Sequence, residues 1–564
     1  MKWNLEKLFF DSRDYQKEMN RLKQDIENYQ HKERKISEIF PDLIEKIWEW
    51  KSRLGKLEVY ANLTYYQNIT SSFFIERKKE LEIFKLTMLE KINRFENTIL
   101  CYEQEEVFQF LKKNPEFFIY LRYIEQFYFN QSDNILFQEN FNTLQALILD
   151  YNSLRNQMEF GTIIVDGETV PLRFQNLRTY QIHDDRNVRK CVFEQVMKSF
   201  HNKKDVMYSY LQKIFQQRKF MSNKKNCSIR SMELLKSELS EEFYFHLIDS
   251  CHRHISLLQK YLSLKLSSFS DHCSYDLALP IQKDMICSFS IQEAMELISQ
   301  SVKVLGSCYE SALQECIDSG HIDTIISEEK HPTIVFTWYG YSFLQFRESF
   351  VDVKNLSHEI GHMMNDIFSI QELPFVYAIS SDFIGEIAAI VNETLLLRYL
   401  ILTAKTKEEK IFYLSKEIEN YVSSVFRPMM FQEFEDYLTE FISSVSYEEC
   451  CDFYEKLLFT YYGDCICNRK DLREEWLQYD KYYRVSYYSY TYASGKLLSN
   501  LIVHNLMNGT LSSEDYLKFL KSGNAKSVLE LFNLLHISFD DTTLFDQGFV
   551  FLSEDLSLLE SLLT

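Results

Sequence analysis

The sequence predicts a mainly α-helical protein with a large hydrophobic core. Of its 564 residues only 13 are glycine and 7 are proline, the two residue types that most often interrupt regular structure. Hydrophobic residues make up 46% of the chain, and no segment has the composition of a disordered region. We therefore expect long helices, with only a few short strands between them.

Two segments have the residues and turn signals that are typical of β-strands. Residues 162–170 contain an Asp166-Gly167 turn between β-branched residues, so they are expected to form a hairpin. A second strand is expected at Thr333–Trp338, shortly before the most informative motif of the chain.

Residues 355–367 are expected to form a helix, because no proline interrupts them and apolar residues recur at helical spacing. They contain an H-E-x-x-H motif from His358 to His362. Residues four apart share a helix face, so both imidazoles can reach one metal ion. Glu359 is then placed beside the ion, where it can act on a water as general base. The alternative is a chance motif in which the histidines are ordinary polar groups on a helix face.

A third ligand is expected on a second, almost wholly apolar helix at residues 382–397. Glu386 and Glu393 are seven residues apart and therefore share one face of that helix. Two carboxylates on a buried face are costly unless other groups compensate them. We predict that Glu386 is the third zinc ligand and that Glu393 accepts from the free N–H of a ligand imidazole. The alternative is a buried ion pair, with Arg398 as a partner of Glu393.

The H-E-I-G-H motif and the following F-I-G-E-I-A-A-I-V-N-E segment resemble the active site of the thimet oligopeptidase family, in particular oligoendopeptidase F and the Pz peptidases. The resemblance extends from about Phe160 to the C-terminus. It includes the segments F-G-T-I to D-G-E (160–168), D-R-N-V-R (185–189), Y-D-L with a proline (275–280), F-S-I-Q-E-A (289–294) and Y-L-K-F-L-K-S-G (516–523).

The resemblance implies a large helical body divided by a deep substrate channel, with zinc at its floor and a few short strands nearby. Residues 1–180 would form one wall of the channel and end in the hairpin, and residues 181–564 would form the catalytic region. An edge strand pairs with the extended substrate in this family, so Thr337 and Trp338 are expected to bind substrate. The implied activity is cleavage of internal bonds in short unfolded peptides.

The chain departs from the family at a histidine that usually lies upstream of several tyrosines. Tyr482 stands at that position, or Lys481 if the register moves by one residue. The family implies that this histidine and the tyrosine phenols bind the substrate and the oxyanion. We expect the hydroxyls of Tyr488 and Tyr492 to donate hydrogen bonds to the substrate and the oxyanion, with Tyr490 as the second choice. The alternative is that these tyrosines only pack in the core. Loss of one oxyanion donor typically costs ~10²–10³ in rate, so a slower enzyme is expected rather than an inactive one.

These residues predict a zinc endopeptidase with one Zn²⁺ per chain, held by His358, His362 and Glu386. The ion would lower the pKa of a bound water to about 7, and Glu359 would move the proton to the leaving amine. One alternative is a peptide-binding relative that has lost turnover, which the missing histidine suggests. Another is a structural zinc protein, although three N/O ligands leave a position open. Co²⁺ or Mn²⁺ could occupy the same ligands.

The net charge of −20 disfavours nucleic acid and anionic membranes as partners, and short peptides are the expected ones. Charged residues within the apolar stretch 384–404 argue against a membrane-spanning helix. The first residues are charged and lack the apolar core of a secretory signal, so a cytoplasmic location is expected. The oligomeric state is left open.

The twelve cysteines are accordingly expected to be reduced thiols. Cys450, Cys451, Cys465 and Cys467 lie close together in the sequence, but no histidine or second C-x-x-C motif completes a zinc site around them.

Overall fold

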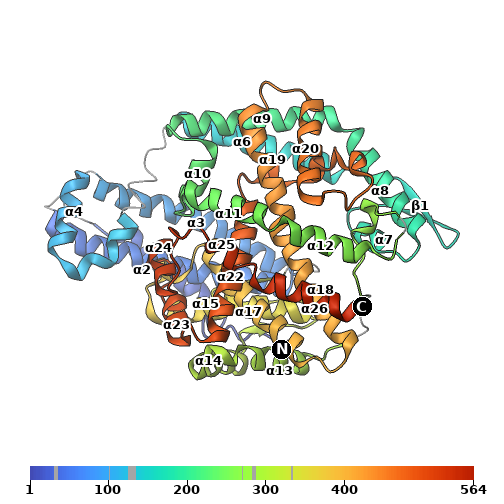
Figure 1. Ribbon diagram of the computed structural model, residues 1–564. Helices are drawn as coiled ribbons and strands as arrows, with labels where there is room; N and C mark the ends of the chain where they lie inside the picture. The colour runs from blue at the N-terminus through green and yellow to red at the C-terminus, as the bar shows by residue number, and fades with distance from the viewer. Residues whose placement is uncertain (31–35, 101, 125–134, 270, 283–287, 332–334) are drawn as a thin grey trace. The chain divides into compact units, whose positions relative to one another are not determined.

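The computed structural model describes residues 1–30, 36–100, 102–124, 135–269, 271–282, 288–331 and 335–564. It is mainly helical with a few short strands, which confirms the fold class expected from the sequence (Figure 1). Of the strand expected at Thr333–Trp338, residues 333 and 334 lie outside the described part, and Phe336–Trp338 form β4. In the part of the chain that is described, no helix is both long and apolar enough to cross a membrane.

The chain forms two compact units, each assembled from three separate stretches. The first unit comprises Met1–Ser132, Cys287–Leu396 and Ile502–Ile537, and the second comprises Asp133–Ile286, Leu397–Leu501 and Ser538–Thr564. The units do not follow the boundary between residues 180 and 181 that the sequence suggested. Two long helices, α17 (Asp382–Thr403) and α22 (Ser489–Asn508), begin in one unit and end in the other.

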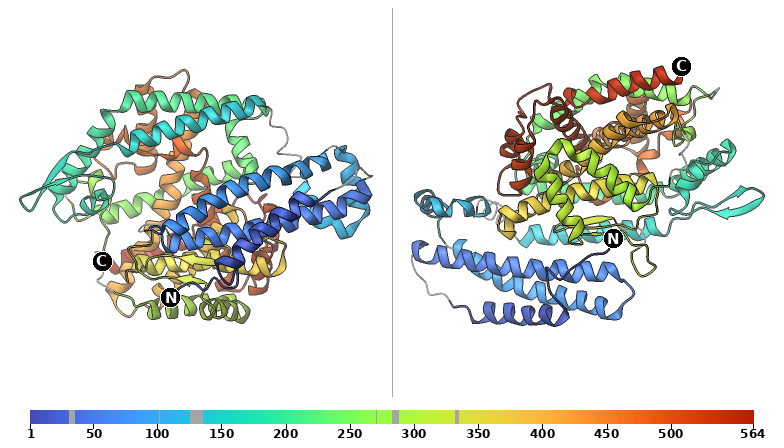
Figure 2. Two further views of the ribbon diagram at one scale, coloured as in Figure 1. Left: turned by 180° about the vertical axis from the view of Figure 1, so that it is seen from behind. Right: turned by 90° about the horizontal axis from the view of Figure 1, so that it is seen from below.

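In the first unit, the long helices α2 and α3 run side by side (Figure 2). Their facing sides are rich in buried aliphatic and aromatic residues, which form the core of this part. The elements of the unit, besides α17 and the end of α22, are α1 (Ser12–Asn28), α2 (Ile36–Gln67), α3 (Ser72–Leu100), α4 (Gln104–Lys113), η1 (Pro115–Tyr120), α13 (Ile291–Ser301), η3 (Val302–Leu305), α14 (Ser307–Asp318), β3 (Ile322–Asp323), β4 (Phe336–Trp338), β5 (Tyr341–Phe343), α15 (Phe350–Glu372), α16 (Phe375–Ala378), α23 (Ser513–Lys521) and α24 (Val528–Leu534).

The first unit contains a three-stranded sheet with the order β3-β5-β4. β4 is antiparallel to β5, and Thr337 lies directly opposite Ser342. The connecting residues Tyr339 (φ 52°) and Gly340 (φ 76°) both adopt the left-handed conformation. Two such residues make the tight turn whose twist matches paired strands. In the order β3-β5-β4, β4 lies at the edge of the sheet, and the turn sets its register against β5.

The described residues of the second unit are helical apart from one hairpin, which projects from the helices in Figures 1 and 2. Its elements, besides the end of α17 and the start of α22, are α6 (Ile135–Asn156), β1 (Thr162–Val165), β2 (Glu168–Pro171), α7 (Leu177–Gln181), α8 (Arg186–His201), α9 (Lys204–Lys224), α10 (Ile229–Lys236), α11 (Glu241–Arg253), α12 (Ile255–Leu266), η2 (Ser274–Asp276), α18 (Lys407–Tyr421), η4 (Val422–Phe426), α19 (Arg427–Phe441), α20 (Tyr447–Tyr462), η5 (Arg469–Leu472), η6 (Glu475–Gln478), α21 (Lys481–Arg484), α25 (Leu544–Gln547) and α26 (Val550–Leu563). The hairpin expected at residues 162–170 is confirmed, with Asp166 and Gly167 at its turn.

Two sequence motifs of the second unit are joined by a buried ion cluster. Asp276 of η2 is fully buried, and its carboxylate accepts from Arg186 at 2.7 Å and from Arg189 at 2.6 Å. The arginines belong to the D-R-N-V-R segment and the aspartate to the Y-D-L segment. Because Asp276 has two guanidinium partners, its burial leaves no unpaired charge.

Candidate metal centre

Helix α15 carries the H-E-x-x-H motif and is well defined at both ends. It begins with a capping box, in which Ser349 accepts from the backbone of Asp352 and Asp352 accepts from the backbone of Ser349. Leu373 has an extended conformation and is followed by a proline, which cannot continue a helix. The helical structure expected for residues 355–367 is confirmed.

Helix α17 packs against α15 with its backbone in close contact at Gly361. A Cβ at Gly361 would lie 2.5 Å from Ala389 Cα and 2.7 Å from the carbonyl oxygen of Ala388. Only glycine permits this approach, which explains why a residue with a poor helix propensity occupies the middle of α15. Nearby, the hydroxyl of Ser357 donates to the backbone carbonyl of Asn392 at 3.1 Å. The close crossing brings the carboxylates of α17 within reach of the α15 histidines.

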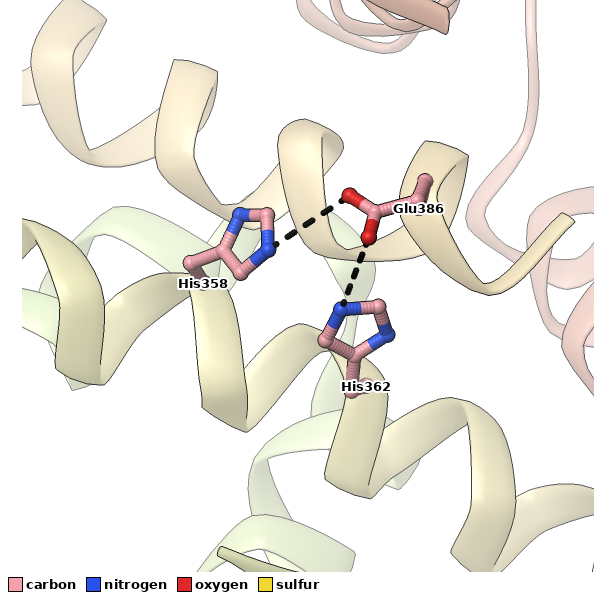
Figure 3. Close-up of side chains that lie close together, drawn as sticks. All are labelled: His358, His362 and Glu386. Carbon is pink, nitrogen blue, oxygen red and sulfur yellow. Dashed lines mark ion pairs between the residues drawn. The ribbon is translucent and has the colours of Figure 1, made fainter. Parts of the chain in front are cut away.

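His358, His362 and Glu386 come together where the two helices cross (Figure 3). Nε2 of His358 is 3.6 Å from Oε2 of Glu386, and Nε2 of His362 is 3.8 Å from Oε1. One ligand atom of each residue lies within 4.8 Å of the others. Among the described residues this is the one group of at least three His, Cys, Asp or Glu side chains with that proximity.

The remaining ring nitrogen of His358 faces a second carboxylate on α17. Nδ1 of His358 is 3.5 Å from Oε2 of Glu393, whose other oxygen is 3.3 Å from Nζ of Lys354. Arg398, the alternative partner of Glu393, instead pairs with Asp555 at 2.9 Å. A carboxylate behind a ligand histidine selects the tautomer in which Nδ1 carries the proton and Nε2 is free to bind a metal.

The two histidines differ in their tendency to be charged. Burial opposes a charge on His358, but the hydrogen bond and charge of Glu393, with the charges of Glu359 and Glu386, outweigh it and raise the pKa of His358. Burial, followed by the charge of His358, lowers the pKa of His362 to about 3. His362 is therefore neutral at physiological pH, as a metal ligand must be.

Glu359 is buried, with only 5% of its surface exposed, and two hydroxyl groups hold it in place. The hydroxyl of Thr337 lies 2.7 Å from Oε2 of Glu359, and that of Ser342 lies 3.2 Å from its backbone carbonyl. Thr337 and Ser342 face each other across β4 and β5, with their hydroxyls 2.8 Å apart. Burial raises the pKa of Glu359, whereas the charge of His358 and the bond from Thr337 act in the opposite direction.

The hairpin that carries these hydroxyls is also attached to α15 one turn beyond His362. The carboxylate of Asp366 accepts from the backbone N–H of Gly340 at 2.9 Å. Burial raises the pKa of Asp366 to about 7, although hydrogen bonds from Gly340 and Tyr339 lower it. The β4–β5 hairpin is thus bonded to α15 at two points, one at Glu359 and one at Asp366.

The tyrosines expected to bind the oxyanion lie around the start of α22. Tyr488 immediately precedes the helix and Tyr492 is in its first turn; their rings meet edge to face at 5.1 Å. Nζ of Lys481 is 4.6 Å from the Tyr488 ring centre. Tyr490 is buried and its hydroxyl lies 3.4 Å from Ser237, so this phenol is not presented to solvent, whereas Tyr492 is 37% exposed. These residues belong to the second unit.

The turn before α22 is held by α19. Tyr487 has a left-handed backbone (φ 47°); its N–H donates to Glu435 at 3.0 Å and its hydroxyl to Asp436 at 2.6 Å. Tyr482, one of the two residues expected at the position of the family histidine, is fully buried and donates to the carbonyl of Phe431 at 2.8 Å.

Several contacts of this site were not expected from the sequence. Asp366 continues the face of His358 and His362 at the same four-residue spacing, and this spacing could have identified it. Thr337 was expected to bind substrate, but its hydroxyl bonds to Glu359. Nothing in the sequence pointed to Ser342 or Lys354.

Comparison with known proteins finds a family model and several relatives that match this chain. Residues 307–551, which include α15 and α17, match the model of Peptidase family M3. Oligopeptidase PepF of Bacillus subtilis is 24% identical over 583 residues, covering 100% of this chain and 87% of that protein. An oligoendopeptidase F homolog of Borreliella burgdorferi is 26% identical over 565 residues, covering 94% of this chain and 93% of that protein.

Solved structures have the same fold. A structure described as a putative peptidase from Chlamydophila abortus has a TM-score of 0.90 and 24% identity, covering 100% of this chain and 98% of that one. Oligoendopeptidase-F from Enterococcus faecium has a TM-score of 0.71 and 22% identity, covering 98% of each chain. The family match spans α15 and α17, and relatives named oligopeptidase and oligoendopeptidase F align with nearly the whole chain, which supports a metalloendopeptidase.

Proposed function

We propose that this protein hydrolyses internal peptide bonds of short, unfolded oligopeptides, using one zinc ion and Glu359 as general base. The observation that carries the proposal is the convergence of His358, His362 and Glu386, with Glu359 held on the same helix by Thr337. The oligopeptidase and oligoendopeptidase names of the relatives support short peptides as the substrate class.

The three side chains fit a zinc ion. Bonds of about 2.1 Å in a tetrahedral centre place donor atoms roughly 3.4 Å apart. The separations of 3.6 and 3.8 Å from Glu386 to the histidines are close to that value. The side chain of Glu386 is 45% exposed, so solvent and substrate can approach from its side. When bound in a site with three protein ligands, zinc supplies an open position, acidifies a water there and polarises a carbonyl.

The residues of α15 and α17 then have distinct roles. His358, His362 and Glu386 hold the ion, and Glu393 keeps the Nε2 of His358 free for it. The carboxylate of Glu359 accepts a proton from the water that attacks the scissile carbonyl and passes it to the leaving nitrogen. The hydroxyl of Thr337 limits the rotation of this carboxylate, so that the base remains oriented between the two transfers.

Peptide binding is assigned to β4 and to the tyrosines around α22. β4 is at the edge of its sheet, where an extended peptide can add as a further strand. Since the Thr337 side chain is bonded to Glu359, the backbone of β4 and the side chain of Trp338 are the groups that contact substrate. Tyr488 and Tyr492 donate to the oxyanion; the exposure of Tyr492 and the adjacent rings support this assignment.

Cleavage of an internally quenched oligopeptide tests the proposal. We expect cleavage at an internal bond, loss of activity with a chelator and recovery when zinc is added back. A folded protein of similar composition should resist cleavage under the same conditions. Failure of the zinc-loaded protein to cleave any member of a mixed peptide library would refute the proposed activity.

A peptide-binding protein without turnover is the second candidate, because a buried tyrosine occupies the position of the family histidine. The two candidates separate in one experiment: saturable binding of library peptides with none of them cut would favour the second. The retention of Glu359 with its hydroxyl partner favours the first, since peptide binding alone does not require a base.

A further inference from the structure

Two cysteines of the second unit lie in contact although they are 194 residues apart in the sequence. The Sγ atoms of Cys273 and Cys467 are separated by 3.3 Å. Cys273 immediately precedes η2, and Cys467 lies in the loop between α20 and η5. In the described part of the chain, the pair belongs to no group of three metal-compatible side chains, so a metal does not account for the contact.

Hydrogen bonds on both sides of the thiols hold the two segments together. The backbone N–H of Cys467 donates to the carbonyl of His272 at 2.8 Å. The side chain of Asn468 accepts from the N–H of Ser274 at 2.8 Å and donates to its hydroxyl at 3.0 Å. Three hydrogen bonds, one between backbone groups and two made by the Asn468 side chain, therefore hold together the two segments that carry the thiols.

The two thiols differ in their exposure to solvent. Cys467 is exposed, whereas Cys273 is buried. The Cys273 thiol donates to Oδ2 of Asp271 at 3.5 Å, and burial raises its pKa to about 11. A reagent in solution meets Cys467 first, and Cys273 is in place to resolve the product.

We propose that Cys273 and Cys467 form an intrachain disulfide when the protein encounters a small-molecule disulfide. The thiolate of Cys467 attacks one sulfur of the reagent, forms a mixed disulfide and releases one thiolate. Cys273 then attacks Sγ of Cys467, and its proton passes to the second departing thiolate. The two protein thiols are oxidised to one disulfide, and the reagent is reduced to two thiols.

The bond would join the loop after α20 to the segment that holds Asp276 against α8. Because it closes a long stretch of chain, it restricts the unfolded state, and disulfides of this kind typically stabilise proteins. For a chain of this length we expect Tm to rise by about 2–4 °C on oxidation. Neither cysteine is among the residues proposed to hold the metal, act as base or bind the peptide, so replacing either one should leave the activity of the reduced protein unchanged.

Oxidised glutathione is the probe for the test. The zinc-loaded protein is equilibrated with it, acid-quenched, alkylated and analysed by intact mass and peptide mapping. We expect the loss of two hydrogen atoms, protection of both cysteines from alkylation and a peptide that links residues 273 and 467. Cys467→Ser should abolish the linked peptide and the rise in Tm.

Cys465→Ser is the matched control. Cys465 is two residues away, but its sulfur faces the carbonyl of Gln259 at 3.4 Å and Ser263 at 3.5 Å. This variant should oxidise like the wild type. Full alkylation of Cys273 and Cys467 after oxidation would overturn the proposal, as would a protein that stops at one glutathione on Cys467. Neither result depends on peptidase activity.

Discussion

The hydroxyl of Thr337 offers a specific test of how the general base is positioned. Replacing Thr337 with valine removes the hydroxyl and keeps the shape of the side chain. The carboxylate of Glu359, only 5% exposed, then loses its 2.7 Å donor. A hydrogen bond to a charged group contributes about 1.5–3 kcal/mol, so loss of this positioning should lower kcat by about 10- to 100-fold.

The effect should appear in kcat rather than in KM, because the Thr337 side chain faces the base and not the peptide. Steady-state cleavage of a quenched peptide by protein with verified zinc content measures both constants. Thr337→Ser restores the hydroxyl and should recover most of the wild-type kcat. An unchanged kcat in the valine variant, or a change confined to KM, would show that Thr337 does not position Glu359.

Three further perturbations follow from the same helices. Gly361→Ala should destabilise the protein by about 1–3 kcal/mol, measured by thermal unfolding, because the added carbon meets α17 backbone at 2.5 Å; a stability equal to wild type would contradict the close crossing. Glu393→Gln should weaken zinc binding by about 10- to 100-fold in a competition with a chelator, whereas an unchanged affinity would exclude support of His358 by Glu393. The pKa of Asp366 is raised to about 7 from its usual 3.8, so the folded state holds a proton that the unfolded state loses, and stability should fall as pH rises from about 4 to 7. Asp366→Asn should remove this contribution to the pH dependence of stability. An identical pH dependence of stability in the wild type and the variant would contradict the raised pKa of Asp366.

The sequence predicted well those features that depend on local spacing. The H-E-x-x-H spacing predicted helix α15 and the shared face of its histidines, and the Asp166-Gly167 pair predicted the hairpin turn. The seven-residue spacing of Glu386 and Glu393 predicted their common face on α17. Each of these follows from a single helix or turn, so no knowledge of distant contacts was needed.

Features that depend on pairing between distant segments were not predicted. Each of the two units is assembled from three separate stretches of chain, a grouping that local spacing cannot reveal. The hydroxyl of Thr337 reaches Glu359 because β4 packs on α15, and strand packing leaves no mark in local spacing. The sequence led us to expect Tyr482 or Lys481 at the position of a family histidine, but the burial of Tyr482 and its hydrogen bond to the carbonyl of Phe431 depend on contacts between distant segments.

The most direct test of the account is a comparison of wild type with Glu359→Gln for bound zinc and for peptide cleavage. Glutamine keeps the size of the side chain and can still accept from Thr337, but it cannot take the proton from water. We expect one zinc ion per chain in both proteins, with cleavage only in the wild type. Equal cleavage by both proteins would contradict the role of Glu359 as general base.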